Sequence, residues 1–228
     1  MLQIIAIGGA GFGNQASDFK MERYLLTQTE KAKPKVCFLA QASAESPAYQ
    51  RQFSQTFQAL DAETSAISLF GRVSPEWSPQ ILEQDLIVVG GGNTRSMLAL
   101  WREWGMDQML QKAYEQGIVL CGSSAGAICW FEECVTDSVW PLGTLKGLGF
   151  LKGSCCPHYD SEPERRPTYR KKVQEGQISP GIALDDHCAA HFVDGSLRTL
   201  VSVQPEAHAY WVDAQGEKML ECAHRLML

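Results

Sequence analysis

Short apolar runs recur along the first half of the chain, and most of them are followed by a polar or amphipathic stretch. Runs that are apolar throughout and rich in β-branched residues are typical of strands buried on both faces, as in parallel sheets. We therefore predict five buried strands, over residues 4–7, 35–40, 64–69, 85–89 and 118–121.

The stretches between these runs carry helical periodicity. Residues 47–60 place Tyr49, Phe53, Phe57 and Leu60 at helical spacing, so this stripe is expected to pack in the core. Further helices are predicted over residues 21–29, 95–104 and 107–116. Alternating strands and helices indicate an α/β fold in which a doubly wound, mostly parallel sheet carries helices on both faces.

The second half of the sequence has a different pattern of apolar and polar residues. Residues 141–153 favour loop and short strand, and the charged residues 162–174 favour a surface helix. Short alternating runs then follow, with turns at Asp194-Gly195 and Gln215-Gly216. These runs predict an antiparallel C-terminal extension that completes the sheet, within a single domain over residues 1–228.

Composition excludes several classes of protein. The chain is 45% apolar and 20% charged, as is ordinary for a globular protein, and its net charge of −6 disfavours nucleic-acid binding. No apolar run is long enough for a membrane span, and the N-terminus runs into glycines without a basic segment, so we expect a cytoplasmic protein with no membrane partner.

Eight cysteines are present, without metal-ligand spacing. We interpret most of them as buried structural thiols, and we expect neither a metal nor a cofactor.

Three glycine-rich or small-residue segments follow predicted strands, over residues 8–14, 90–93 and 122–126. The carboxyl ends of parallel strands meet at one edge of a sheet, so all three should border one crevice. Gly11-x-Gly13-x-x-Ala16 resembles the tail of a dinucleotide-binding fingerprint, but the lysine and hydroxyl of a phosphate loop are missing. We therefore expect this loop to line the crevice.

Gly122-x-Ser124-x-Gly126 has the spacing of a nucleophile elbow. In such a turn the strained serine is raised at the start of a helix, and the flanking glycines let backbone pass close to backbone. The free N–H groups there can stabilise an oxyanion. The alternative is an ordinary small-residue turn between a strand and a helix.

Four motifs arrive in the order seen in a known family: Gly90-Gly91-Gly92-Asn93-Thr94, Gly122-Ser123-Ser124-Ala125-Gly126-Ala127, Pro157-His158-Tyr159 and Ile182-Ala183-Leu184-Asp185-Asp186. With them the sequence resembles the dipeptidase E-like serine peptidases, whose relatives include cyanophycinases. The resemblance implies a fold like that of class I glutamine amidotransferases, with a serine in place of the nucleophilic cysteine.

The resemblance also implies roles for individual residues. Ser124 resembles the nucleophile and His158 its general base, and the oxyanion hole would combine the amide of Ala125 with that of Gly91 or Gly92. A serine needs such a base within hydrogen-bond reach to become nucleophilic. His187 and His191 could compete for this role, although His191 lies in an apolar run and is expected to be a satisfied sheet residue.

Two carboxylates could orient His158, and the resemblance supports an acidic residue at both places. Asp137 is expected near the end of the helix that follows Ser124, whereas Asp186 follows a predicted strand. A strand end is held more rigidly than a loop, so we favour Asp186. Its neighbour Asp185 should point to the opposite side.

Asn93, Arg165 and Arg166 are the candidates for substrate binding. The best-known branch of the family removes an N-terminal aspartate with the help of a basic residue, and the two arginines lie in the comparable segment with different spacing. They could equally belong to the solvated face of a surface helix.

The leading hypothesis is a metal-independent serine exopeptidase that cleaves short peptides through an acyl-enzyme. The alternatives are a serine amidase or β-aspartyl hydrolase, and a catalytically silent protein that binds a small ligand. A homodimer is possible through apolar helix residues, namely Leu98, Leu100, Trp101 and Trp104.

Overall fold

The computed structural model describes residues 1–13 and 19–226. The loop expected over residues 8–14 is therefore seen as far as Gly13, and Asn14 and Ala16 lie outside the described residues.

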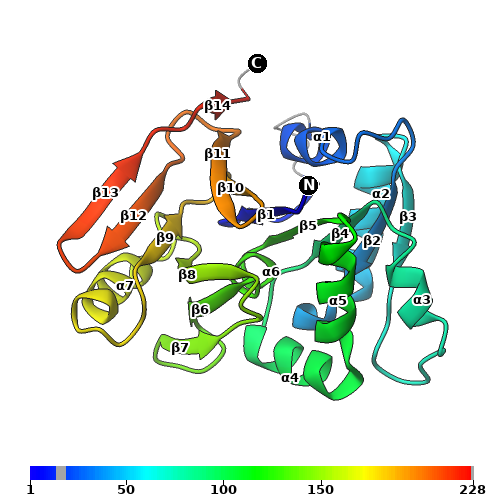
Figure 1. The fold of residues 1–228 in the computed structure, drawn as a ribbon, viewed down its shortest axis with the longest axis horizontal. Helices are drawn as coiled ribbons and strands as arrows, with labels where there is room; N and C mark the ends of the chain where they lie inside the picture. The colour runs from blue at the N-terminus through cyan, green and yellow to red at the C-terminus, as the bar shows by residue number, and fades with distance from the viewer. Residues whose placement is uncertain (14–18, 227–228) are drawn as a thin grey trace.

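The larger of two sheets contains the predicted parallel strands (Figure 1). Its members are β1 (Gln3–Ile7), β2 (Lys35–Leu39), β3 (Glu63–Ala66), β4 (Leu86–Val89), β5 (Val119–Ser123), β10 (Cys188–Val193), β11 (Ser196–Ser202) and β14 (His224–Arg225). They lie in the order β14-β11-β10-β1-β5-β4-β2-β3. Neighbouring strands in the run β1-β5-β4-β2-β3 pair in parallel. Strand β10 runs antiparallel to both β1 and β11. The predicted α/β class and its antiparallel C-terminal strands are confirmed.

Helices cover both faces of this sheet because alternate strand residues point to opposite sides. On one face, α1 (Lys20–Thr27) and α2 (Pro47–Gln58) pack on residues such as Ile5 and Phe38. On the other face, α4 (Thr94–Trp104) and α5 (Met106–Glu115) pack on residues such as Ile4 and Val89. In Figure 1, α1 lies above the strands and α4 and α5 lie below them.

Aromatic packing anchors α2 in the predicted way. Phe53 stacks on Phe38 of β2 with ring centroids 4.4 Å apart, and Phe57 packs against Phe53 at 4.6 Å. Among the apolar residues considered for a dimer interface, Leu98 and Trp101 are fully buried in the core of this chain, whereas Trp104 is 41% exposed.

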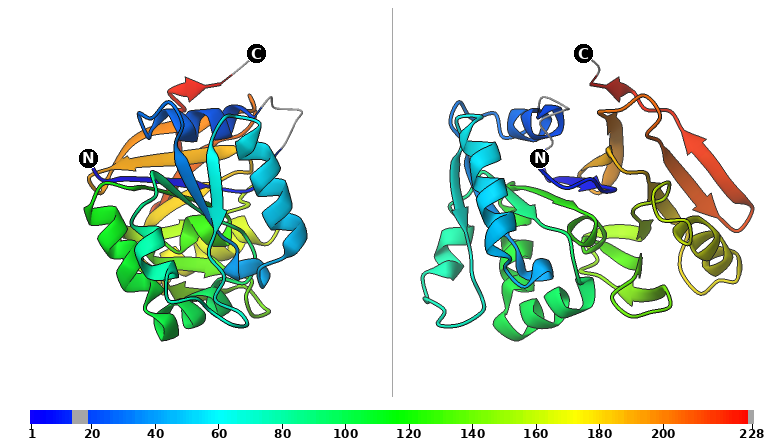
Figure 2. Two further views of the ribbon diagram at one scale, coloured as in Figure 1. Left: turned by 90° about the vertical axis from the view of Figure 1, so that its right-hand side faces the viewer. Right: turned by 180° about the vertical axis from the view of Figure 1, so that it is seen from behind.

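The hairpins predicted to complete the large sheet belong in part to a second sheet. This sheet consists of β6 (Phe131–Thr136), β7 (Gly143–Lys146), β8 (Leu151–Cys156), β9 (Gly181–Leu184), β12 (Ala209–Asp213) and β13 (Gly216–Leu220). Their order is β13-β12-β9-β8-β6-β7, with α7 (Arg165–Gln174) packed on β12 and β13. Figure 2 shows the β12–β13 hairpin reaching away from the helices of the larger sheet. Sequence alternation identifies these strands but not the sheet to which each belongs, because that choice is made by tertiary packing.

Two local expectations are wrong. The helix after Ser124, α6, ends at Ile128, and the chain then forms β6, so Asp137 follows a strand and not a helix. The sequence Phe131-Glu-Glu-Cys-Val-Thr136 contains aromatic and β-branched residues that favour a strand, but its apolar and polar residues do not alternate. In addition, the short helix α3 (Trp77–Ile81) lies in a stretch for which no element was predicted.

No helix of the described residues is long and apolar enough to cross a bilayer. All eight cysteines are free thiols, and seven of them are buried. Burial raises the pKa of the Cys37 thiol to about 12, which keeps it protonated and unreactive.

Candidate active site

Ser124 occupies the sharp turn between β5 and α6. Its backbone has φ 55° and ψ −114°, a conformation that an L-residue adopts only when its surroundings enforce it. The N–H of Ser124 donates to the carbonyl of Ile7, at the end of β1, over 3.0 Å. Side chains at Gly122 or Gly126 would collide with backbone, at the carbonyls of Gly126 and Val89 respectively. These two glycines therefore allow the turn to close.

The segment after β4 borders Ser124 on one side. A methyl group on Gly91 would lie 3.4 Å from the Cβ of Ser124, so this backbone passes directly beside the serine. Asn93 caps α4, because its side-chain oxygen accepts the N–H of Ser96 over 2.9 Å and its amide nitrogen donates to the Ser138 carbonyl over 3.3 Å. Asn93 thus holds the end of this segment in place.

His158 approaches from the smaller sheet, two residues beyond the end of β8. Its N–H donates to the carbonyl of Gly8 over 3.2 Å, which ties the turn to the loop after β1. Its Nε2 lies 2.8 Å from Ser124 Oγ. The imidazole is therefore placed to accept the proton of the serine hydroxyl.

Asp186 lies on the far side of the imidazole, with Oδ1 2.7 Å from His158 Nδ1. The strands β8 and β9 are parallel neighbours, so the residues that follow them emerge side by side. Gly9 makes room for the pair, because a side chain there would overlap both Asp186 Oδ1 and His158 Nδ1. Ser124, His158 and Asp186 form one chain of hydrogen bonds, which we call the Ser–His–Asp chain.

The structure does not bring Asp137 to His158. Asp137 follows β6, which is also a parallel neighbour of β8, so strand order alone allows either carboxylate. Its Oδ1 instead lies 3.5 Å from Arg165 Nη2, and its side chain is 56% exposed.

The two arginines expected near the substrate are bonded to carboxylates of the chain itself. Arg165 is buried, with Nε donating to Glu162 Oε2 over 2.6 Å and Nη1 donating to the Val135 carbonyl over 3.2 Å. The interpretation of Arg165 as part of a solvated face is therefore wrong. Arg166 is partly exposed and pairs with Glu217.

Arg166 also packs over two aromatic rings next to the His158 turn. Its guanidinium carbon lies 5.4 Å from the ring centroid of Tyr159 and 4.9 Å from that of Tyr210. The hydroxyl of Tyr159 donates to Glu217 Oε2 over 2.7 Å. This cluster fastens the residue after His158 to the β12–β13 hairpin.

The competing histidines have other environments. His191 is a satisfied sheet residue, as expected, with Nδ1 2.7 Å from the Tyr24 hydroxyl and Nε2 3.0 Å from Gln3 Oε1. Burial lowers its pKa to about 4, so this imidazole is neutral. His187 borders a small cavity with Gly9 and the buried Glu22, and its ring makes no hydrogen bond to Ser124 in the described structure.

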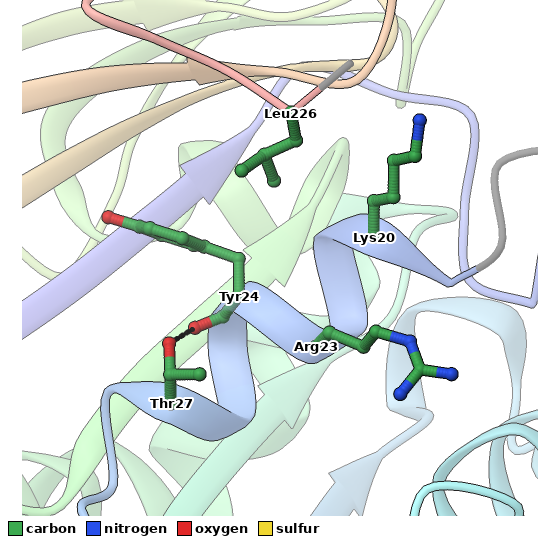
Figure 3. Close-up of a pocket in the computed structure, with 5 residues that line it drawn as sticks. All are labelled: Lys20, Arg23, Tyr24, Thr27 and Leu226. Carbon is green, nitrogen blue, oxygen red and sulfur yellow. Dashed lines mark hydrogen bonds between the residues drawn. The ribbon is translucent and has the colours of Figure 1, made fainter. Parts of the chain in front are cut away.

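A larger pocket, of about 400 Å³, lies elsewhere, between α1 and the C-terminal segment (Figure 3). Lys20, Arg23, Tyr24 and Thr27 line it from α1, and Leu226 closes it. It contains no member of the Ser–His–Asp chain. This pocket and the Ser–His–Asp chain are therefore separate places on the molecule.

The pKa values of the adjacent residues Asp185 and Asp186 are shifted in opposite directions. Burial opposes ionisation of Asp186, but hydrogen bonds from His158 and Ser161 stabilise the carboxylate and hold the pKa of Asp186 below its usual range. Burial dominates at Asp185 and raises its pKa to about 6. Asp185 faces away from His158, accepts the backbone N–H of His208 over 2.9 Å, and lies near Asp160.

Comparison with known proteins identifies the family of the chain. The sequence model of peptidase family S51 matches residues 4–200. The chain belongs to peptidase family S51. The resemblance to dipeptidase E-like peptidases is thereby confirmed, and this member of the family is a serine peptidase.

A relative from Bacillus subtilis (strain 168), described as the uncharacterized peptidase YgaJ, is 47% identical over 212 residues, which cover 93% of this chain and 92% of the relative. The fold matches a crystal structure of a peptidase from an acI-B1 Actinobacterium with a TM-score of 0.74 at 16% identity, over 97% of this chain and 95% of the other. It also matches a putative peptidase E protein from Listeria monocytogenes EGD-e with a TM-score of 0.59 at 18% identity, over 98% and 100% of the two chains.

Sequence reasoning missed Gly9 as a site residue. It singled out the surrounding loop for its glycines, yet the need for glycine at this position comes from a histidine and an aspartate that lie far away in the sequence. It also missed Ser161 and Asp160, which contact Asp186. Their only sequence signal is that they lie two and three residues after His158.

We expect Gly9→Ala to abolish most of the peptidase activity, by about 100-fold or more, while the protein still folds. The added methyl group takes the space in which His158 and Asp186 meet. Gly11→Ala is the control from the same loop, because a methyl group there meets nothing within 4 Å. Gly11 has a positive φ, of 66°, and Gly9 does not, so the control variant carries a backbone cost that the Gly9 variant lacks. Wild-type activity in the Gly9 variant would contradict the geometry of the Ser–His–Asp chain.

We also expect Asp185→Asn to stabilise the protein at pH 8 by about 1–3 kcal/mol and to have little effect at pH 4. The pKa of Asp185 is raised from 3.8 to about 6, so its ionisation costs stability as the pH rises through this interval. Asparagine removes that cost and can still accept the His208 N–H. Urea unfolding at the two pH values measures the difference, and Asp213→Asn controls for the loss of one negative charge. An equal effect at both pH values would contradict the assignment.

Proposed function

We propose that the protein is an exopeptidase that cleaves short peptides through an acyl-enzyme on Ser124, with His158 as general base and Asp186 as the residue that orients it. The observation that carries this proposal is the pair of hydrogen bonds on the two nitrogens of His158, 2.8 Å to Ser124 Oγ and 2.7 Å to Asp186 Oδ1. Because Asp186 accepts the Nδ1 proton, Nε2 carries the lone pair that takes the serine proton.

The reaction follows from these positions. Ser124 Oγ attacks the scissile carbonyl as its proton passes to His158 Nε2, and Asp186 stabilises the imidazolium that forms. His158 then gives the proton to the leaving amine, and the C–N bond breaks to leave the acyl-enzyme. A water molecule, deprotonated by His158 in turn, hydrolyses the ester.

The oxyanion hole is assigned to the amide of Ala125 and to the Gly91–Gly92 segment. Within the part of the chain that the structure describes, the N–H groups of Ala125 and Gly92 donate no hydrogen bond. Gly91 lies against Ser124, and the hydroxyl of Tyr49 interacts with its backbone. Free N–H groups beside the nucleophile supply the stabilisation that the tetrahedral intermediate needs.

The two arginines argue against a preference for acidic first residues. Arg165 is bonded to Glu162 and lies 3.5 Å from Asp137, and Arg166 is bonded to Glu217. An acidic substrate side chain would compete with these carboxylates and would be repelled by them. We therefore infer that the enzyme does not prefer peptides with an acidic first residue.

Asp186→Asn should lower kcat by about 10⁴-fold on the precedent of serine triads, whereas Asp137→Asn should lower it by less than about 10-fold. The first change removes the acceptor of the His158 Nδ1 proton, and the second weakens only the contact to Arg165. Peptide mass mapping should find a fluorophosphonate adduct on Ser124 and none on the buried Ser123. The assignment fails if Ser123 carries the label, or if Asp137→Asn is the more damaging change.

A dipeptide panel with varied first residues tests the substrate class. We expect kcat/KM for Asp-x dipeptides to be no higher than for Ala-x dipeptides. Arg166→Ala should change both values by the same factor, because its charge is already paired with Glu217. A selective loss for Asp-x dipeptides in the Arg166 variant would show that Arg166 binds the substrate.

A further inference from the structure

Asp160 contacts the acid of the Ser–His–Asp chain from outside that chain. Its Oδ1 accepts the backbone N–H of Asp186 over 2.8 Å. The two residues are far apart in the sequence, so the bond is a tertiary contact between the turn after β8 and the turn after β9.

The turn that carries His158 brings Asp160 into this position. The carbonyl of His158 accepts the N–H of Glu162 over 3.1 Å, which folds the chain back over itself. The N–H of Tyr159 donates to the Leu184 carbonyl over 3.1 Å, so the same turn is also stapled to the end of β9. Base and acid are thus joined both through their side chains and through the backbone of Asp186.

The surroundings of Asp186 show why its backbone needs such an anchor. The next residue, His187, has φ 64°, so the chain leaves Asp186 through a strained position. Asp186 lies three residues beyond Ala183, the last residue of β9 that pairs with β8, so this pairing no longer fixes its backbone. An acceptor on this N–H replaces the missing ladder bond.

Asp160 also lies close to Asp185, the residue that precedes Asp186. Burial raises the pKa of Asp185, and the charge of Asp160 adds to this effect. The bond to the Asp186 N–H itself needs only an oxygen acceptor, so it can be separated from the charge by an uncharged side chain that keeps the oxygen.

We propose that Asp160 is a positioning residue that fixes the backbone of Asp186, and through it the His158 imidazole, by accepting the Asp186 N–H. The inference rests on the proposed function in assigning Asp186 to the orienting role. The role requires an oxygen atom at position 160 that accepts this hydrogen bond, and it does not require a negative charge there.

Asp160→Asn and Asp160→Leu separate the acceptor from the charge. The two side chains have nearly the same shape, but only asparagine offers an oxygen to the Asp186 N–H. We expect Asp160→Leu and Asp160→Ala to lower kcat by about 10- to 100-fold with KM within about twofold of wild type. Asp160→Asn should remain within about threefold of wild type in kcat.

Asp85→Ala is the matched control. Asp85 Oδ2 accepts the backbone N–H of Lys35 over 2.8 Å, so it makes the same kind of bond between distant segments. This bond lies at the starts of β2 and β4, the edge of the sheet opposite the site. Asp85→Ala should therefore lower the melting temperature without lowering kcat.

A readout without substrate keeps the inference separate from the proposed function. The proton held between His158 Nδ1 and Asp186 should give a low-field ¹H resonance in the wild-type protein, and this resonance should persist in Asp160→Asn and weaken in Asp160→Leu. If the wild type cleaves none of the dipeptides, the proposed function fails, and the resonance still decides the role of Asp160.

Three results would overturn the inference. If Asp160→Leu keeps the kcat and the low-field resonance of the wild type, the bond from Asp160 does not position Asp186. If Asp160→Asn lowers kcat as much as Asp160→Leu does, the effect comes from the negative charge of Asp160 and not from its bond to the Asp186 N–H. Loss of the fold in both the alanine and leucine variants would make Asp160 a general structural residue.

Discussion

The site depends on the close approach of four backbone segments, at the ends of β1, β4, β5 and β9. Where they meet, a single Cβ atom is too large: Gly8 faces the carbonyl of Asp185, Gly122 faces that of Gly126, and Gly126 faces that of Val89. The parallel arrangement delivers the strand ends to one edge, and the absence of side chains lets them touch. The glycines are therefore a steric condition for the Ser–His–Asp chain.

Strain is concentrated in the same place. Ser124 and His158 both have a positive φ, of 55° and 53°, a conformation that costs of order 1–3 kcal/mol for each residue. Each is held by a hydrogen bond from its own N–H to the β1 end, at Ile7 and Gly8 respectively. The end of the N-terminal strand thus holds both Ser124 and His158 in their strained geometry.

Much of this arrangement could be predicted from the sequence. Uniformly apolar runs that end at glycines identify β1, β4 and β5 and their shared edge, because burial on both faces leaves a strong local signal. Gly122-x-Ser124-x-Gly126 indicates the turn for the same local reason. The helix over Tyr49 to Leu60 also follows from periodicity, and Phe53 and Phe57 are buried as expected.

The remainder depends on long-range choices that leave no local signal. Asp137 and Asp186 follow strands on either side of β8, so strand order allows either carboxylate and only side-chain placement separates them. Arg165 reads as a surface residue in a charged stretch, yet it is buried because Glu162 and the Val135 carbonyl supply its partners. The division into two sheets is likewise a matter of tertiary packing.

This division has a consequence for the way the molecule loses activity. The serine belongs to the larger sheet, whereas the histidine and the aspartate belong to the smaller one, and the 2.8 Å bond between His158 and Ser124 spans the two. The length of this bond therefore depends on how the two sheets are aligned with each other. On the proposed mechanism, a slippage of about one ångström between them would stop the reaction without breaking any strand pairing within either sheet.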